Sequence, residues 1–408
     1  MKNVGVARET FPGERRVALT PAVVPQLAKA GIEVVVESRA GLDAGFTDEA
    51  YREKGAKIAP GRSDAFATDA ILQVRSFGAN PDAGKTDLDL VRPDQVVIGF
   101  SHALWGPEVL KELASRKATA FAMELMPRIT RAQSMDALSS QATISGYKAV
   151  LLAADHLQKM FPMLTTAAGT IAPARVLVLG AGVAGLQAIA TARRLGAVVE
   201  AYDVRPAVKE QVESLGAKFV ELELETEGAE GAGGYAKEQS EEFLKKQREA
   251  LGRVIAANDA VITTALVPGA EAPVLMTAEM VRGMAPGSVV VDIAAEQGGN
   301  VELTRPDEVV EDGGVTIIGP TNLPASVPHH ASQMYAKNIS AFLLHLFKEG
   351  ELQIDPEDEI TRETLITRGG EVVHPRVREV LGLPQLDSPK PEAVASAASD
   401  TEDRSQDK

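Results

Sequence analysis

A glycine-rich turn after an apolar run is the part of the sequence best suited to hold a charged ligand. Gly180, Gly182 and Gly185 form the pattern G-x-G-x-x-G directly after the apolar residues 176–179. In this pattern the first glycine permits a tight turn, the second lets the backbone approach a pyrophosphate, and the third lets a helix pack closely on the strand. The N-terminus of that helix would offer free N–H groups to phosphates, so the pattern predicts a dinucleotide-binding turn.

Asp203 supplies the second component of this binding unit. It ends another apolar run, residues 198–203, where a carboxylate can accept hydrogen bonds from the adenosine ribose hydroxyls. A negative charge there repels a 2′-phosphate and favours NAD(H) over NADP(H), while Arg205, two residues later, points in the opposite direction. A lone glycine pattern is usually only a turn, but the flanking apolar runs and the acid make dinucleotide binding the preferred interpretation.

A polar loop, residues 127–136, is expected between the last strand of the first region and a long helix. Its Arg128, Gln133 and Asp136 could line a cleft that holds a nicotinamide ribose and carboxamide. The simpler alternative is an arginine–aspartate pair that braces the loop, with Ser134 as the N-cap of the helix. The spacing alone leaves both interpretations open.

Other polar residues lie near predicted strand ends, where a parallel sheet places its ligands. Arg16 could bind a carboxylate, a diphosphate or a partner protein, or simply lie on the surface. His102 could act as a general acid or base, although a single histidine is more often structural. Asp292 and Glu296 could include a general base, or could hold a loop and cap a helix.

The composition limits the class of protein. The chain has 408 residues, 45% of them hydrophobic and 24% charged, which is typical of a soluble protein with two domains. Its net charge of −15 argues against nucleic acid and anionic membranes as direct partners. With no cysteine and only scattered histidines, neither thiol catalysis nor a metal site is expected. No apolar run reaches about 18 residues and no signal peptide is recognisable, which predicts a cytoplasmic protein without a membrane span.

Alternating strand and helix patterns predict an α/β fold with two Rossmann-like parallel-sheet lobes. The first lobe has expected strands at residues 4–7, 33–36, 70–74, 96–100 and 118–122, and a helix between Thr20 and Gly31. The second lobe has expected strands at residues 175–180, 197–203, 217–222, 259–265, 288–294 and 315–319, in the order 3-2-1-4-5-6.

Two long helices are expected to join the lobes. One spans about residues 135–160, and the other about residues 327–348 with Ser326 as its N-cap. The first lobe is then discontinuous and comprises residues 1–136 and 327–384, whereas the second comprises residues 137–326. A cleft between the lobes would hold the nicotinamide end of the dinucleotide. Residues 226–237 are predicted to form a mobile loop, and residues 385–408 a disordered acidic tail.

Several strings of residues resemble the superfamily of alanine dehydrogenases and proton-translocating transhydrogenases, over roughly residues 1–380. They are residues 6–21, residues 178–188 at the glycine turn, residues 267–273 and residues 291–300. Within the superfamily the chain is similar to the NAD(H)-binding α subunit (domain I, split form) of the transhydrogenases. The matches that favour this subunit are Arg128, Gln133, Asp136 and Ser139 in a nicotinamide loop, residues 233–237 in a mobile loop, and residues 332–338 in a C-terminal helix.

The resemblance implies a set of functional residues. Gln133 would orient the nicotinamide ribose, Arg128, Asp136 and Ser139 would complete its loop, and Tyr235 would close over the bound nucleotide. The expected cofactor-binding residues are Gly180, Ala181, Gly182, Val183, Gly185, Asp203, Val204, Arg205, Tyr235, Ala265 and Leu266.

The resemblance also implies a reaction and partners. Hydride would pass directly from NADH on this chain to NADP⁺ on a separate β subunit, as in the Re/Si-specific transhydrogenases. Membrane subunits, including a small membrane α subunit, would couple this transfer to proton translocation. The chain would form a homodimer, and its partners would hold it at the inner face of the cytoplasmic membrane.

Two other functions stay open. Alanine dehydrogenases have a catalytic lysine where Arg75 falls and an aspartate where Glu296 stands, and arginine cannot readily give up its proton as that lysine does. Arg16 and His102 nevertheless match, so an amino-acid dehydrogenase is the first alternative. The second is a non-catalytic module that only senses NAD(H).

Overall fold

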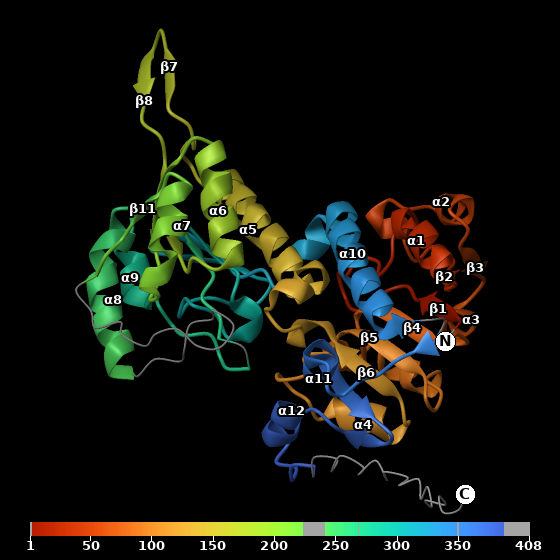
Figure 1. The fold of residues 1–408 in the computed structure, drawn as a ribbon. Coiled ribbons are helices and arrows are strands. Elements are labelled where there is room, and N and C mark those ends of the chain that lie inside the picture. Colours follow the sequence, from red (N-terminus) through yellow and green to blue (C-terminus); the bar gives the residue numbers. More distant parts are fainter. Residues whose placement is uncertain (1, 223–240, 268, 349–350, 387–408) are drawn as a thin grey trace, which may run out of the picture.

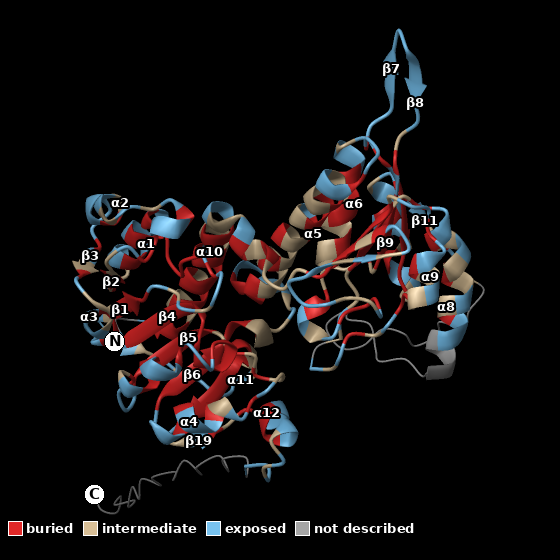
Figure 2. Ribbon diagram, turned by 180° about the vertical axis from the view of Figure 1, so that it is seen from behind, coloured by how far each residue is buried: buried red, intermediate tan, exposed pale blue. Residues whose placement is uncertain are grey.

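The computed structural model describes residues 2–222, 241–267, 269–348 and 351–386, with the backbone alone for residues 241–244. Figure 1 shows two lobes, each built on one sheet, with two long helices between them. Both sheets are predominantly parallel, and most of the residues in their central strands are buried (Figure 2). Within the described residues, no helix combines the length and the apolar character needed to cross a bilayer.

The first sheet has eight strands in the order β19-β18-β6-β5-β4-β1-β2-β3. Strands β1 to β6 are parallel, and β18 runs antiparallel to β6. The sheet therefore joins the N-terminal region of the chain to a segment close to its C-terminus. The strand bounds are β1 (Asn3–Val6), β2 (Glu33–Glu37), β3 (Lys57–Ala59), β4 (Ala70–Arg75), β5 (Val96–Phe100), β6 (Thr119–Ala122), β18 (Leu365–Arg368) and β19 (Glu371–Val372).

Short helices surround this first sheet. Their bounds are α1 (Val24–Lys29), α2 (Asp48–Glu53), α3 (Arg62–Phe66), α4 (Val109–Ser115), α11 (Glu359–Thr364) and α12 (Pro375–Val380). The single helix predicted between residues 20 and 31 is wrong: a 3-10 turn, Pro21–Val23, precedes α1. Pro25 has no N–H to donate to the carbonyl of Pro21, and the N–H of Val24 takes that carbonyl instead.

The second sheet has seven strands in the order β11-β10-β9-β12-β13-β15-β14. Its first six strands follow the predicted order 3-2-1-4-5-6, and β14, which was not predicted, pairs antiparallel with β15 at the edge. The strand bounds are β9 (Arg175–Leu179), β10 (Val198–Tyr202), β11 (Lys218–Phe219), β12 (Ala260–Thr263), β13 (Val289–Asp292), β14 (Val309–Asp312) and β15 (Val315–Ile318). The helices of this lobe are α6 (Val183–Arg194), α7 (Lys209–Ser214), α8 (Glu241–Ala256) and α9 (Ala278–Arg282).

The two long helices are α5 (Ala137–His156) and α10 (Pro328–Leu346). They pack on each other, and α5 also packs along α6 of the second lobe. The close approach of α5 and α6 depends on Gly146, because a Cβ there would lie 2.0 Å from the carbonyl oxygen of Ala184. The predicted division of the chain at residues 136/137 and 326/327, close to the starts of these helices, stays a prediction.

The ends of the long helices differ from those predicted. Asp136 caps α5, and Leu157 is extended, so the helix stops before residue 160. Ser326 does not cap α10, because its hydroxyl donates to the carbonyl of Leu323 in the 3-10 turn Leu323–Ser326. Between α5 and the second sheet, an exposed hairpin of β7 (Leu164–Thr166) and β8 (Gly169–Ile171) projects from the lobe (Figures 1 and 2). A second short hairpin, β16 (Phe347–Lys348) with β17 (Glu351–Leu352), follows α10.

Candidate functional site

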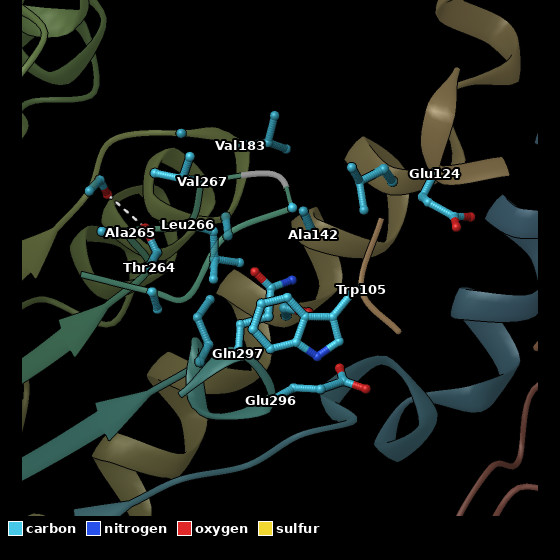
Figure 3. Close-up of a pocket in the computed structure, with 18 of the residues that line it drawn as sticks. Trp105, Glu124, Ala142, Val183, Thr264, Ala265, Leu266, Val267, Glu296 and Gln297 are labelled. Carbon is cyan, nitrogen blue, oxygen red and sulfur yellow. Dashed lines mark hydrogen bonds between the residues drawn. The ribbon is translucent and has the colours of Figure 1, made fainter. Parts of the chain in front are cut away.

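A cavity of about 790 Å³ lies between the lobes, and residues of both sheets line it. The second lobe contributes the glycine turn after β9, the end of β10 and the loop after β12. The first lobe contributes residues at the ends of β4 and β5. Figure 3 shows Thr264, Ala265, Leu266 and Val267 from the second lobe, together with Trp105 and Glu124 from the first. The carboxyl ends of both parallel sheets therefore meet at one cavity, where α/β folds bind their ligands.

The glycine turn has the geometry that the sequence pattern predicts. Gly180 has a φ of +99°, a left-handed conformation that favours glycine. A Cβ on Gly185 would lie 1.9 Å from the carbonyl oxygen of Gly180, so only glycine lets α6 approach β9 this closely. A Cβ on Gly182 would meet no atom within 4 Å. Because Gly182 is the N-cap of α6 and gives it no side-chain cap, the backbone at this helix end is open to a ligand in the cavity.

Asp203 lies where the pattern predicts it, at the end of β10 and on the cavity wall. Its Oδ2 atom accepts a hydrogen bond of 2.7 Å from the N–H of Ala181, which ties the acid to the glycine turn. Arg205 forms an ion pair with the same carboxylate, with 2.7 Å between its Nη2 atom and Oδ2. The two residues whose sequence signals point in opposite directions are thus direct partners.

The loop after β12 is held by Asn300. The Oδ1 atom of Asn300 accepts from the N–H of Ala265 at 2.9 Å, and its Nδ2 atom donates to the carbonyl of Ala265 at 2.8 Å. Asp292 in turn accepts from the N–H of Asn300 and from the hydroxyls of Thr263 and Thr304. Asp292 is completely buried in this network, which favours its structural interpretation over a role as general base.

A charged cluster occupies the first-lobe side of the cavity. Arg16 and Glu14 form an ion pair of 2.7 Å, with 4% and 0% of their side chains exposed. Burial alone would raise the pKa of Glu14, but Arg16 outweighs it and lowers that pKa to about 2. The remaining donors of Arg16 reach Gln141 of α5 at 2.9 Å and Asn322 at 3.3 Å. Each nitrogen of the Arg16 guanidinium therefore already has a partner within the protein.

A second ion pair of this cluster crosses between the lobes. The Nη1 atom of Arg75, at the end of β4, lies 3.2 Å from Oε1 of Glu296 in the loop after β13. The Nε2 atom of His102 lies 3.9 Å from the same oxygen, and His102 has an uncommon φ of +49° for a residue other than glycine. The guanidinium of Arg75 also covers the ring of Phe11, at 4.1 Å from its centroid.

Glu9 is a buried carboxylate beneath this cluster. Its two oxygens accept from the N–H groups of Val74 at 2.6 Å and Arg75 at 3.1 Å, at the end of β4. Burial raises the pKa of Glu9 to about 8, and the nearby charge of Glu14 adds to that shift. Nothing in the local sequence around Glu9 points to this environment.

The polar loop before α5 is only partly in the cavity. Arg128 lines the cavity, whereas Gln133 is exposed in the 3-10 turn Thr130–Met135 and does not line it. Asp136 caps α5 by accepting from the N–H of Ser139 at 2.8 Å and from its hydroxyl at 2.6 Å. The alternative that made Ser134 the N-cap is therefore wrong, because the helix begins after Asp136.

Contacts from the C-terminal region of the chain hold this loop. The Nδ2 atom of Asn338 in α10 donates to the carbonyl of Ser134 at 2.9 Å. The guanidinium of Arg131 lies 2.6 Å from Asp358, the N-cap of α11. The other oxygen of Asp358 accepts from the N–H of Thr361 at 3.0 Å and lies 2.9 Å from Nε2 of His345. The segment that carries Gln133 is thus anchored by residues far away in the sequence.

Most predicted cofactor-binding residues come together in the cavity. Those that line it are Gly180, Gly182, Val183, Asp203, Val204, Arg205, Ala265 and Leu266, with Arg128 from the nicotinamide loop. Ala181 and Gly185 are buried behind this wall and support the turn, whereas Gln133, Asp136 and Ser139 lie outside it. Tyr235, residues 226–237 and residues 387–408 of the predicted tail fall outside the described residues.

Several lining residues were not anticipated from the sequence. They are Leu104, Trp105, Glu124, Gln141, Gln247, Arg248, Thr264 and Thr321. Trp105 was the most accessible of these to sequence reasoning, because it is the only tryptophan of the chain and follows the end of β5. The others lie on helices or in loops whose approach to the cavity depends on the packing of the two lobes.

Comparison with known proteins extends these observations to the whole chain. The families described as "Alanine dehydrogenase/PNT, N-terminal domain" and "Alanine dehydrogenase/PNT, C-terminal domain" match residues 5–145 and 149–375. An "NAD(P) transhydrogenase subunit alpha" chain of Rhodospirillum rubrum is 49% identical over 375 residues, which cover 91% of this chain and 98% of that protein.

Solved structures agree with this likeness. A transhydrogenase structure from Sinorhizobium meliloti superposes with a TM-score of 0.81 and 46% identity, and covers 91% of this chain and 100% of its own. An L-alanine dehydrogenase structure gives a TM-score of 0.78 and 27% identity, with 93% and 99% covered. The chain belongs to the alanine dehydrogenase/PNT family, and within it resembles transhydrogenase α subunits.

Proposed function

We propose that this chain is the NAD(H)-binding subunit of a proton-translocating transhydrogenase. In this role it holds NADH while a partner subunit holds NADP⁺, and hydride passes directly between the two nicotinamide rings. The single observation that carries the proposal is the inter-lobe cavity, which joins an open glycine turn and an acid at the end of β10 in a chain 49% identical to a transhydrogenase α subunit. Membrane subunits would couple the transfer to proton translocation.

The residues of the cavity fit a dinucleotide. Open space faces Gly182, where a pyrophosphate would approach the N-terminus of α6. Asp203 lies at the point where it can accept from the adenosine ribose hydroxyls. The rigid loop at Ala265 and Leu266 leads from there toward the first lobe, where the nicotinamide end would lie. The cofactor supplies the hydride, and the protein supplies binding and orientation.

The nicotinamide loop provides the proposed positioning groups. Arg128 would contact the nucleotide from the cavity wall, and Gln133 would orient the nicotinamide ribose from the exposed side of the loop. Asp136 and Ser139 would act indirectly, since their hydrogen bonds cap α5 and fix the end of this loop. An exposed Gln133 suits a reaction in which a second protein must bring its own ring to the same place.

An alanine-type dehydrogenase is the second candidate, because Arg16, Arg75 and His102 line the same cavity. The ion pairs weaken this candidate. Glu14 neutralises Arg16, and Glu296 pairs with Arg75, so neither guanidinium presents an uncompensated charge to a substrate carboxylate. Arg75 is also a poor proton donor or acceptor at neutral pH.

A hydride-transfer assay tests the proposal. Reduction of an NAD⁺ analogue by NADPH is measured with this chain alone and with an added NADP(H)-binding subunit. Turnover only in the mixture is the expected result. No turnover in the mixture, together with NADH formation from NAD⁺ and L-alanine by the chain alone, would establish the dehydrogenase instead. Binding of NADH without turnover in either assay would leave only the sensing role.

The proposal includes the partners and the location. The chain would act as a homodimer, with a separate β subunit that binds NADP(H) and a small membrane α subunit. These partners would hold it at the inner face of the cytoplasmic membrane, as a Re/Si-specific transhydrogenase component. The molar mass of the chain in solution, and its co-purification with the membrane subunits, are the measurements that test these points.

A further inference from the structure

The ion pair between Asp203 and Arg205 has a geometry that the proposed function does not require. The Oδ1 atom of Asp203 accepts from the N–H of Arg205 at 2.9 Å and from its Nε atom at 2.8 Å. The Oδ2 atom accepts from Nη2 of Arg205 at 2.7 Å and from the N–H of Ala181 at 2.7 Å. Both side chains are mostly buried, with 5% of Asp203 and 12% of Arg205 exposed, and both residues line the cavity.

These four hydrogen bonds fill the carboxylate. An ionised carboxylate has about four acceptor positions, and here three are taken by Arg205 and one by the glycine turn. Ribose hydroxyls can bind Asp203 only where Arg205 withdraws at least one of its side-chain contacts. The guanidinium would then remain beside the adenosine ribose, because the backbone N–H of Arg205 still holds that residue to Asp203.

A guanidinium at this place has a known chemical preference. It presents paired N–H donors that match the oxygens of a phosphate group. An arginine beside the end of the second strand of a dinucleotide fold is the group that accommodates the 2′-phosphate of NADP(H). In this chain such a residue is present, but the negative charge of Asp203 both neutralises it and repels a phosphate.

We propose that Arg205 is a latent site for a 2′-phosphorylated adenosine ribose, and that the ion pair with Asp203 keeps this site closed. Selection of NAD(H) then depends on the pair and not on Asp203 alone. The inference rests on the proposed function, since it concerns the choice of nucleotide at the same site. For a subunit that must hold NADH while NADP⁺ is bound elsewhere, the closed site keeps the wrong nucleotide out of this cavity.

Dissociation constants of NADPH and NADH, measured by nucleotide fluorescence, test the inference on four forms of the full chain. They are the unmodified protein, Asp203→Asn, Asp203→Asn with Arg205→Ala, and Asp203→Asn with Arg248→Ala. Asparagine can still accept from the N–H of Ala181, so the glycine turn keeps its support. Arg248 is the matched control, because it lines the same cavity and its loss changes the charge equally.

Asp203→Asn is expected to bind NADPH at least about tenfold more tightly than the unmodified chain, and NADH about tenfold more weakly. Adding Arg205→Ala should abolish most of the gain for NADPH, whereas adding Arg248→Ala should leave most of it. A gain that survives Arg205→Ala undiminished, or no gain in Asp203→Asn, would overturn the inference. In the first case relief of repulsion explains the change without a phosphate site.

Two further measurements keep the test decisive. Competition by adenosine 2′,5′-bisphosphate against adenosine 5′-monophosphate isolates the 2′-phosphate, and the bisphosphate should gain only in variants that retain Arg205. Thermal unfolding shows whether each variant folds, and Asp203→Ser replaces Asp203→Asn where the latter does not. Failure of the unmodified chain to bind NADH would count against the proposed function, whereas normal NADH binding with no Arg205-dependent gain would count against this inference alone.

Discussion

The two lobes have the same strand order around their first strand but use the end of that strand differently. Around β1 the first sheet runs β3-β2-β1-β4-β5-β6, and around β9 the second runs β11-β10-β9-β12-β13-β15. After β9 the chain turns through glycines directly into α6 and leaves its N-terminus open. After β1 the chain continues without a helix to Glu9, whose carboxylate takes the N–H groups of Val74 and Arg75.

The difference shows how one topology supports two tasks. The second lobe leaves backbone donors at its strand ends for a ligand, whereas the first lobe satisfies its own donors and pairs Glu14 with Arg16. The first lobe thereby becomes a preformed charged wall, and the second becomes the binding surface. Function in such folds depends on the loops at the carboxyl ends of the strands and not on the sheet itself.

The sharpest test of this division compares Gly185→Ala in the second lobe with Gly5→Ala in the first. In both, the new Cβ would lie within about 2 Å of a carbonyl oxygen, that of Gly180 or of Ala65, so each should cost about 3 kcal/mol of unfolding free energy. Only Gly185→Ala displaces the glycine turn, and we expect it to weaken NADH binding by about tenfold or more. Urea unfolding and NADH titration measure the two effects.

Gly182→Ala is the matched control, because its Cβ meets no protein atom within 4 Å. It should leave the unfolding free energy nearly unchanged and still weaken NADH binding. Equal losses of NADH affinity in folded Gly5→Ala and Gly185→Ala would show that the first lobe binds the nucleotide as directly as the second.

The loop between the lobes should separate binding from reaction. Gln133→Ala is expected to slow hydride transfer by about 100-fold, because a small misplacement of the reacting ring has a large effect on rate. NADH affinity should change little, since Gln133 is exposed and does not line the cavity. Single-turnover transfer and NADH titration measure the two quantities, with Ser134→Ala in the same exposed turn as control. Comparable losses in rate and affinity would contradict this role for Gln133.

Glu9 makes the first lobe sensitive to pH. Its pKa is raised from 4.5 to about 8, so between these values the folded chain retains a proton that the unfolded chain has released. The unfolding free energy should therefore fall as the pH rises through this window, by up to about 1.4 kcal/mol per pH unit, and level off above it. Thermal unfolding across this pH range follows the change.

Glu9→Gln should remove this slope. Its amide nitrogen would face an N–H of Val74 or Arg75, so the variant should also be less stable at pH 5. Glu53→Gln, at an exposed carboxylate of the same lobe, is the control and should keep the slope. An unchanged slope in Glu9→Gln would mean that Glu9 is not the titrating group.

The smallest expected effects concern the tether between Asp358 and Arg131. Asp358→Ala removes both the N-cap of α11 and the contact with the nicotinamide loop, and should cost about 1 kcal/mol of stability. Arg131→Ala removes only the tether, so it should slow hydride transfer by a few-fold without that loss. Urea unfolding and single-turnover transfer compare the two variants. A stability loss in Arg131→Ala equal to that in Asp358→Ala would assign the effect to the tether and not to the cap.

Local patterns predicted the regions of the molecule that depend on local interactions. The apolar run before Gly180 predicted β9 and the turn after it, and the strand order of the second sheet followed from the fold to which such a turn belongs. The short edge strands β3 and β14 were missed, because strands of three or four residues at an edge carry little hydrophobic signal. The bounds of the long helices failed where a carbonyl or an acid found a different partner from the expected one.

The charged wall of the cavity could not be predicted in the same way. Glu14 and Arg16 are neighbours in sequence, but their contacts with Asn322 join residues about 300 positions apart. Asp358 and Arg131 are similarly distant, and the raised pKa of Glu9 arises from burial that only the folded lobe creates. The sequence identified residues able to carry charge, and the packing of the lobes decided which of them became partners.

The discontinuous first sheet has a consequence for how the protein is made. Strand β6 has β5 on one side and β18 on the other, and the ribosome synthesises β18 only after the whole second lobe. Until then the outer edge of β6, including Phe121 opposite Leu365, has no strand to pair with. The second lobe can fold as the chain emerges, because its strands are contiguous in sequence, whereas the first lobe must wait. A chaperone that binds nascent chains would therefore find its longest-lived target on this edge of the first lobe.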